Sequence, residues 1–143
     1  VGVCSAATKE AAAQTLSITL GDERVQQVNV CLLGDDVTTK KPHPLIYQTA
    51  AQRLGVPTER CVVVEDSLIG LQAATAAGMK CIITYTPSTA SVDFYSHGAK
   101  AKMPDLASAG VQLEDIFGPL RTEGLEAELL VTVRDPIETK VGL

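Results

Sequence analysis

Apolar and polar residues follow one another along this chain in blocks that predict alternating strands and helices. Short apolar runs rich in valine and cysteine are typical of buried strands, and they occur at Val1–Cys4, Val28–Leu33, Cys61–Val64 and Lys80–Thr84. The blocks between them carry alanine and leucine at helical spacing, and they are Lys9–Leu20, Pro44–Leu54 and Leu68–Ala77. This order with short links predicts an α/β fold, a doubly wound, Rossmann-like parallel sheet with helices on both faces.

Residues suited to helix ends support these bounds. Gly21, Gly55 and Gly78 each follow a predicted helix, where the left-handed backbone that often ends a helix favours glycine. Pro44 lies in the first turn of the second helix, and Ser67 is a good N-cap for the third.

The pattern after the fourth strand is less regular. Thr86–Ser96 reads as a polar loop and Lys102–Phe117 as a series of short helical turns. Further along, Glu126–Leu130 suits a helix and Leu129–Val133 suits a strand equally well, so both alternatives stay open. We therefore divide the chain into a core domain of residues 1–118 and a C-terminal tail or linker of residues 119–143.

Composition narrows the classes of function. The 143 residues are 45% apolar and 3% aromatic, and the net charge is −5 with no basic tract. This balance argues against nucleic acid as a partner, and no apolar run reaches the length of a membrane span. The four cysteines are Cys4, Cys31, Cys61 and Cys81. They lie in or beside predicted strands and form no CxxC pair. This pattern predicts buried, reduced thiols in an intracellular protein.

Two adjacent acids, Glu65 and Asp66, directly follow the apolar strand Cys61–Val64. Neighbouring carboxylates repel each other and are costly to desolvate unless something compensates their charge. Mg²⁺ compensates well, because it takes oxygen ligands and keeps positions for water and phosphate oxygens. Since ligands of open parallel sheets bind beyond the carboxyl ends of the strands, the sequence predicts a metal and a phosphate here.

Two further groups follow strand ends on the same side of the predicted sheet. Ser5 and the backbone of Ala6 lead into a helix N-terminus, which suits phosphate oxygens. Lys41 stands in a Lys-Pro-His-Pro turn that would hold its ammonium in place. Each group taken alone has a plainer interpretation: Ser5 as an N-cap, Lys41 as a solvated lysine, and the acids as helix N-terminal charges. Their joint occurrence favours one shared site, in which Lys41 approaches Asp66.

The arrangement resembles the haloacid dehalogenase (HAD)-like hydrolase superfamily, and more narrowly the CbbY-like sugar-phosphate phosphatases of photosynthetic organisms. The likeness covers about residues 1–106, and its segments are Val3–Ser5, Lys41–Pro44 with Ile46–Tyr47, and Val62–Ala74 continuing to Ala77–Cys81. The last of these segments is the most specific.

The resemblance implies roles for individual residues. Ser5 and Ala6 would bind the transferred phosphoryl group, and Lys41 would neutralise the nucleophile and the phosphoryl oxygens. Asp66 would ligate Mg²⁺, with Glu65 as a direct or water-mediated partner. Such enzymes attack a phosphate ester with an aspartate and then hydrolyse the aspartyl-phosphate. The implied substrate is a small sugar phosphate, foremost a sugar bisphosphate. The implied location is the chloroplast stroma, with the cytosol as the alternative.

The chain also departs from this family. No DxDG segment, which supplies the family's nucleophile and acid–base aspartates, occurs in the 143 residues, and the helical cap is missing too. Val131–Pro136 places one acid after an apolar run but lacks a second acid and a glycine, so we interpret it as a linker, a docking tail or the start of another module. Leu45 stands where the family usually has an acid. The sheet is therefore predicted to be incomplete in its N-terminal half, and these 143 residues alone are predicted to be catalytically inactive.

The strand order of the family leaves a gap between Val1–Cys4 and Cys61–Val64, and unpaired edges of this kind recruit another strand. A missing N-terminal segment or another protein chain could fill it, Leu129–Val133 could fold back into it, or the domain could be degenerate and held by partners. A fragment of a longer enzyme is the interpretation we favour. The alternative in function is a degenerate HAD-like structural or interaction subunit without catalytic activity.

Overall fold

A computed structural model of the chain describes residues 1–117 and the backbone of a further strand at residues 128–131. The strands are β1 Gly2–Cys4, β2 Val30–Leu32, β3 Cys61–Glu65, β4 Lys80–Thr84, β5 Ala101–Met103 and β6 Glu128–Val131. The α-helices are α1 Lys9–Leu20, α2 Asp22–Val25, α3 Leu45–Leu54, α4 Leu68–Ala76 and α5 Leu113–Phe117.

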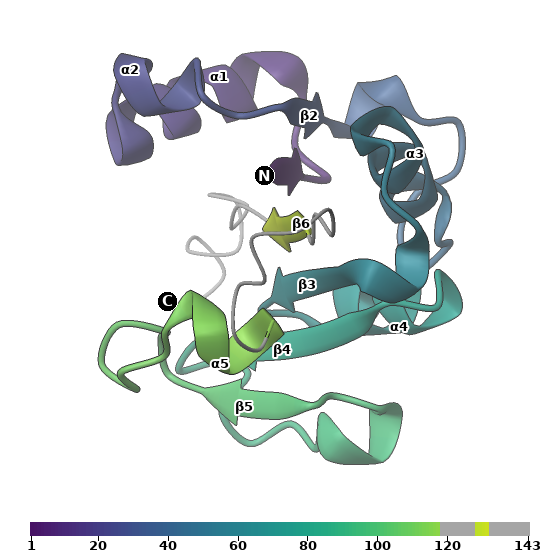
Figure 1. Cartoon of the computed structure of the whole chain (residues 1–143), viewed down its shortest axis with the longest axis vertical. Coiled ribbons are helices and arrows are strands. Elements are labelled where there is room, and N and C mark those ends of the chain that lie inside the picture. The colour runs from purple at the N-terminus through teal and green to yellow at the C-terminus, as the bar shows by residue number, and fades with distance from the viewer. Residues whose placement is uncertain (118–127, 132–143) are drawn as a thin grey trace.

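The six strands form one sheet in the order β2-β1-β6-β3-β4-β5, and every neighbouring pair is parallel (Figure 1). The predicted α/β fold class is confirmed, and all four predicted strands are present. Helices α3 and α4 contact the strands and each other, so apolar side chains from both helices and from β1 to β4 share one core. The largest fully buried side chains in that core include Tyr47, Phe94, Leu71 and Ile83.

Strand β6 lies in the central position, between β1 and β3, which is where the sequence predicts a gap (Figure 1). Leu130 is opposite Gly2 of β1 and Val63 of β3, and Val131 is opposite Val3 and Val64. Of the ways to fill the gap, the structure shows the one in which the chain's own later segment supplies the strand. Residues 128–131 are therefore part of the sheet, and a division of the chain at residue 118 stays a prediction.

Local signals in the sequence account for the helix ends. The Thr8 hydroxyl accepts a hydrogen bond from the Ala11 amide and caps α1. The Ser67 hydroxyl accepts from the Gly70 amide and caps α4. Gly55, at the end of α3, has the left-handed backbone that its identity predicts.

Part of Lys102–Phe117, predicted as helical turns, is strand β5 instead. Ala101–Met103 pairs with β4 at the edge of the sheet and is only partly buried, so its sequence lacks a strong strand pattern. The Lys102 ammonium donates to the carbonyls of Ala90 (2.7 Å) and Val92 (2.9 Å), which fixes the preceding loop over the sheet edge. The short helix α2 was not expected either.

The prediction that all four cysteines are buried is wrong for Cys31. Cys4, Cys61 and Cys81 are buried and free, whereas Cys31 is exposed and also free. The cause is its place in the edge strand β2, where the side chains of Val30 and Leu32 face the core and the one between them faces outward. Burial raises the pKa of the Cys4 and Cys81 thiols to about 12.

No helix within residues 1–117 has both the length and the apolar character needed to cross a membrane.

We expect Cys31 to react with a thiol reagent at pH 8 well before the other three cysteines. Cys4, Cys61 and Cys81 are buried, so their modification waits on opening of the fold, whereas the exposed Cys31 is open to the reagent. Counting modified thiols against time in the native protein, with Cys31→Ser as control, tests this. Equal rates at all four cysteines would contradict the burial of Cys4, Cys61 and Cys81.

We expect Leu130→Pro to destabilise the domain by about 3 kcal/mol or more, because proline lacks the N–H that a central strand needs. Urea unfolding followed by circular dichroism measures the effect. Leu130→Val keeps the amide and strand propensity and is the matched control, with a change of about 1 kcal/mol or less. Similar stability of the proline and valine variants would show that β6 does not complete the sheet.

Candidate functional site

The Lys41 ammonium joins the carboxyl ends of two strands that lie on either side of β6. Its Nζ donates to the carbonyl oxygen of Cys4 at the end of β1 (3.3 Å) and to Oε1 of Glu65 at the end of β3 (2.7 Å). The side chains of Lys41 and Glu65 are nearly covered, at 9% and 1% exposure. The pair is thus a buried ion pair at the edge of the sheet where ligands of such folds bind.

Both carboxylate oxygens of Glu65 are surrounded by hydrogen-bond donors. Oε1 accepts from Lys41 and from the Tyr47 hydroxyl (2.6 Å). Oε2 accepts from the Asp66 amide (3.1 Å) and from the Ser67 amide (3.4 Å) and hydroxyl (3.1 Å). A buried carboxylate is stable only with this kind of compensation, and the donors fix its position closely.

Gly70 leaves the space that the Glu65 carboxylate occupies. A Cβ atom at residue 70 would lie 1.9 to 2.3 Å from the three carboxylate atoms of Glu65. The first turn of α4 therefore holds this carboxylate against its backbone, and only glycine permits the approach.

This geometry decides how a magnesium ion could be held. Among the described residues, no group of three or more His, Cys, Asp or Glu side chains is placed to hold a metal. Direct coordination by Glu65 would cost it hydrogen bonds that compensate its burial. Mg²⁺ is commonly bound through one or two carboxylates, with water and phosphate oxygens completing the shell. Asp66, which follows Glu65 and is half-buried, is a carboxylate of the kind that such a water-rich site uses.

Ser5 is not the N-cap of α1, because Thr8 takes that place. Ser5 is 2% exposed. Its amide donates to the Leu32 carbonyl, and its Oγ accepts from the Ala7 amide (3.1 Å). Within residues 1–117, neither the Ser5 hydroxyl proton nor the Ala6 amide has a hydrogen-bond acceptor. Both donors lie one or two residues beyond the Cys4 carbonyl that Lys41 contacts.

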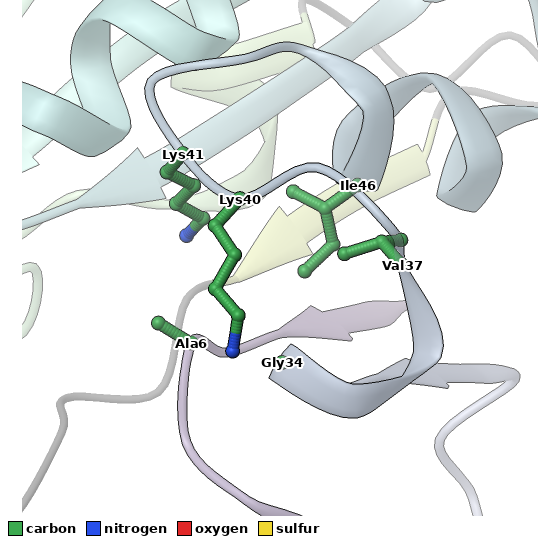
Figure 2. A pocket seen from close by; sticks show the side chains of 6 residues that line it. All are labelled: Ala6, Gly34, Val37, Lys40, Lys41 and Ile46. Atoms are coloured by element: carbon green, nitrogen blue, oxygen red, sulfur yellow. The ribbon is translucent and has the colours of Figure 1, made fainter.

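A hollow lies beside these groups and is lined by Ala6, Gly34, Val37, Lys40, Lys41 and Ile46 (Figure 2). The Lys40 side chain extends across it, with the ammonium toward Ala6 and Gly34 (Figure 2). A Cβ at residue 34 would lie 2.3 Å from the Ala6 carbonyl oxygen, so the chain after β2 packs tightly under the Ser5–Ala7 loop. The hollow therefore has a positively charged wall on one side and a fixed backbone loop on the other.

The structure shows an ion pair between Lys41 and Glu65, the neighbour of Asp66. The expected approach of Lys41 to Asp66 stays a prediction. Tyr47 and Gly70 contribute to the site but were not predicted to do so. Gly70 could have been identified from the sequence, because it is a glycine in the first turn of a helix that begins shortly after two acids. No sequence pattern distinguishes Tyr47 from an ordinary core residue.

The sequence of this chain is similar to those of known hydrolases. The sequence model of the haloacid dehalogenase-like hydrolase family matches residues 1–78. A haloacid dehalogenase-like hydrolase domain-containing protein of Arabidopsis thaliana is 51% identical over 122 residues, which are 85% of this chain and 37% of the relative. A CBBY-like protein of the same plant is 50% identical over 94 residues, or 66% of this chain and 29% of the relative.

The chloroplastic A. thaliana protein Suppressor of Quenching 1 is 46% identical over 71 residues, which are 50% of this chain and 6% of that protein. Among solved structures, CbbY from Rhodobacter sphaeroides in complex with phosphate is 34% identical with a TM-score of 0.69. The match covers 76% of this chain and 48% of the CbbY chain. A variant of the same protein was solved with xylulose-1,5-bisphosphate. The chain thus spans about half of this structure and well under half of the curated relatives.

We expect Gly70→Ala to destabilise the protein by about 2 to 4 kcal/mol, because the new Cβ displaces the Glu65 carboxylate and leaves the Lys41 charge poorly compensated. Urea unfolding measures the change. Ile69→Ala, at an exposed position of the same helix, is the control and should change stability by about 0.5 kcal/mol or less. If the two variants are equally stable, the carboxylate does not lie where it is described.

Proposed function

Because this chain belongs to the haloacid dehalogenase-like hydrolase family, we propose that it carries the phosphate-binding and metal-binding part of a phosphatase of small sugar phosphates. The observation that carries the proposal is the Lys41 ammonium, which spans the ends of β1 and β3 next to Ser5. A positive charge fixed at the ligand-binding edge of a parallel sheet suits a phosphoryl group.

The chain's own groups would act on a phosphate ester mainly by binding and charge neutralisation. The Ser5 hydroxyl and the Ala6 amide donate hydrogen bonds to phosphoryl oxygens. The Lys41 ammonium offsets the charge on those oxygens, and its contacts to Cys4 and Glu65 keep it in place. Since phosphoryl transfer depends chiefly on positioning and electrostatic stabilisation, these are the contributions that such a site makes.

Asp66 is the residue that would hold Mg²⁺. When bound, the ion adds positive charge beside the phosphoryl oxygens and orients them. Glu65 acts by holding Lys41, since its oxygens already accept hydrogen bonds from Lys41, Tyr47 and Ser67. A water-mediated contact between Glu65 and the ion is compatible with this arrangement.

The proposed substrate class is a sugar bisphosphate. Its support is the likeness to CbbY, a variant of which was solved with xylulose-1,5-bisphosphate. The ammonium groups of Lys40 and Lys41 on one hollow suit a ligand with more than one negative group. The proposed location is the chloroplast stroma, supported by the likeness to plant proteins, one of them chloroplastic. The cytosol is the alternative.

We further propose that the 143 residues alone do not turn over a phosphate ester. They contain no DxDG segment, and so they lack the nucleophile that the family likeness implies. Loss of a covalent nucleophile typically costs several powers of ten in rate.

A second candidate function is a non-catalytic interaction subunit. The observation in its favour is β6, which fills the centre of the sheet from within the chain. A sheet completed in this way does not depend on another segment to fill its centre. This property suits a degenerate HAD-like subunit of a larger assembly.

Binding of inorganic phosphate to the 143-residue protein, measured by calorimetry with and without Mg²⁺, separates the two candidates. We expect phosphate to bind, Lys41→Met to weaken binding about tenfold or more, and Asp66→Asn to remove the effect of Mg²⁺. Lys80→Met, at the exposed start of β4, is the matched control and should bind as the unmodified protein does.

Phosphate affinity that neither Mg²⁺ nor Lys41→Met changes would favour the interaction subunit. Turnover of a sugar bisphosphate or p-nitrophenyl phosphate by the purified chain would contradict the proposed inactivity.

A further inference from the structure

Tyr47 contacts both charged groups of the buried ion pair. It lies in the first turn of α3, its side chain is fully buried, and its hydroxyl donates to Oε1 of Glu65 (2.6 Å). Its ring lies under Lys41, with Nζ 4.7 Å from the ring centroid. A core residue that only fills space has no need of either contact.

We propose that Tyr47 is a positioning residue, which holds the Lys41 ammonium where it meets a phosphoryl group. This inference rests on the proposed function of Lys41. The ring acts directly, through a cation–π contact, and the hydroxyl acts through Glu65.

The ring limits where the ammonium can go. An ammonium within about 6 Å of an aromatic centroid is attracted to the face of the ring, and the attraction grows when water is excluded. Nζ is also bonded to Oε1 of Glu65 and to the Cys4 carbonyl. The ring, the carboxylate and the carbonyl come from α3, β3 and β1, so the ammonium is held from three elements.

The hydroxyl sets how strongly Glu65 attracts Lys41. Oε1 accepts from the ammonium and from the phenol together, at 2.7 and 2.6 Å. A phenol is a neutral donor, so it stabilises the carboxylate without adding positive charge. Without the phenol, the charge on Oε1 would be shared only with the ammonium, so Glu65 would offset more of the charge of Lys41. The Tyr47 hydroxyl therefore allows Lys41 to stay bonded to Glu65 while the ammonium charge of Lys41 still acts on a bound anion.

The alternative is that Tyr47 is a core residue whose contacts with the ion pair have no consequence for anion binding, since it also belongs to the main hydrophobic core. The two interpretations differ in one measurable respect. An effect that acts through Lys41 disappears when Lys41 is removed, whereas an effect of core packing persists.

The test is a double-mutant cycle in the 143-residue protein. Tyr47→Phe keeps the ring and removes the hydroxyl, and Tyr47→Leu removes both; each is made with Lys41 present and with Lys41→Met. The probe is inorganic phosphate with Mg²⁺, measured by calorimetry. Tyr85→Phe is the matched control, because its ring lies 5.5 Å from a different ammonium, that of Lys102.

We expect Tyr47→Phe to weaken phosphate binding about threefold to fivefold and Tyr47→Leu about tenfold, a loss no larger than that of Lys41→Met. Both losses should fall to about twofold or less in the Lys41→Met protein, and Tyr85→Phe should have no effect. Unchanged phosphate affinity in the Tyr47 variants, or an equal loss with and without Lys41, overturns the inference. If Tyr47→Leu does not fold, the comparison rests on Tyr47→Phe, which removes one oxygen only.

The same variants, unfolded in urea without phosphate, separate failure of the inference from failure of the proposed function. Absence of coupling between residues 41 and 47 in the free energy of unfolding overturns the inference by itself. Coupling together with a phosphate affinity that Lys41→Met leaves unchanged shows that the contacts are real but that Lys41 does not bind the anion. The proposed function then fails, and the positioning role fails with it.

Discussion

The ion pair between Lys41 and Glu65 is the interaction on which both the site and the local fold depend. Neither charge is stable alone away from water, and the cost of desolvation is offset only when both partners are present and fully hydrogen-bonded. The pair connects the segment before α3 with the ends of β1 and β3. The contacts that orient the candidate phosphate site are therefore the same contacts that hold these elements together, and neither can be altered without the other.

Much of the fold could be predicted because its elements carry local signals. The bounds of Lys9–Leu20 and Lys80–Thr84 match the structure, since caps and apolar runs mark them. Strand β5 could not be predicted in the same way, because an edge strand of three half-buried residues needs little apolar sequence. The outward side chain of Cys31 depends on β2 being an edge strand, which is a property of sheet order rather than of local sequence.

The proximity of Lys41 to the acids at the end of β3 could be predicted, and the Lys41–Glu65 ion pair agrees with it, but the geometry of the site could not be predicted. Adjacent carboxylates at a strand end indicate charge in need of compensation, and that inference holds for Glu65, whose oxygens accept from Lys41, Tyr47 and Ser67. The sequence cannot tell which way each carboxylate points, and so it could not show that Glu65 faces Lys41 and Tyr47 while held by hydrogen bonds within the fold. Tyr47 could not be found in advance, because a buried tyrosine in an apolar helix face looks the same whether or not its hydroxyl meets a charge.

The central place of β6 also sets the order in which this domain can assemble during synthesis. Gly2 pairs with Leu130, so the contact at the middle of the sheet joins residues separated by nearly the whole described chain. Contacts between residues so far apart in sequence form late, because a large loop must close first. While the ribosome is still translating, β1 with β2 and β3 with β4 can pair, but their inner edges stay open until residues 128–131 have left the exit tunnel. Until that strand is added, the unpaired inner edges of β1 and β3 leave the domain prone to aggregation.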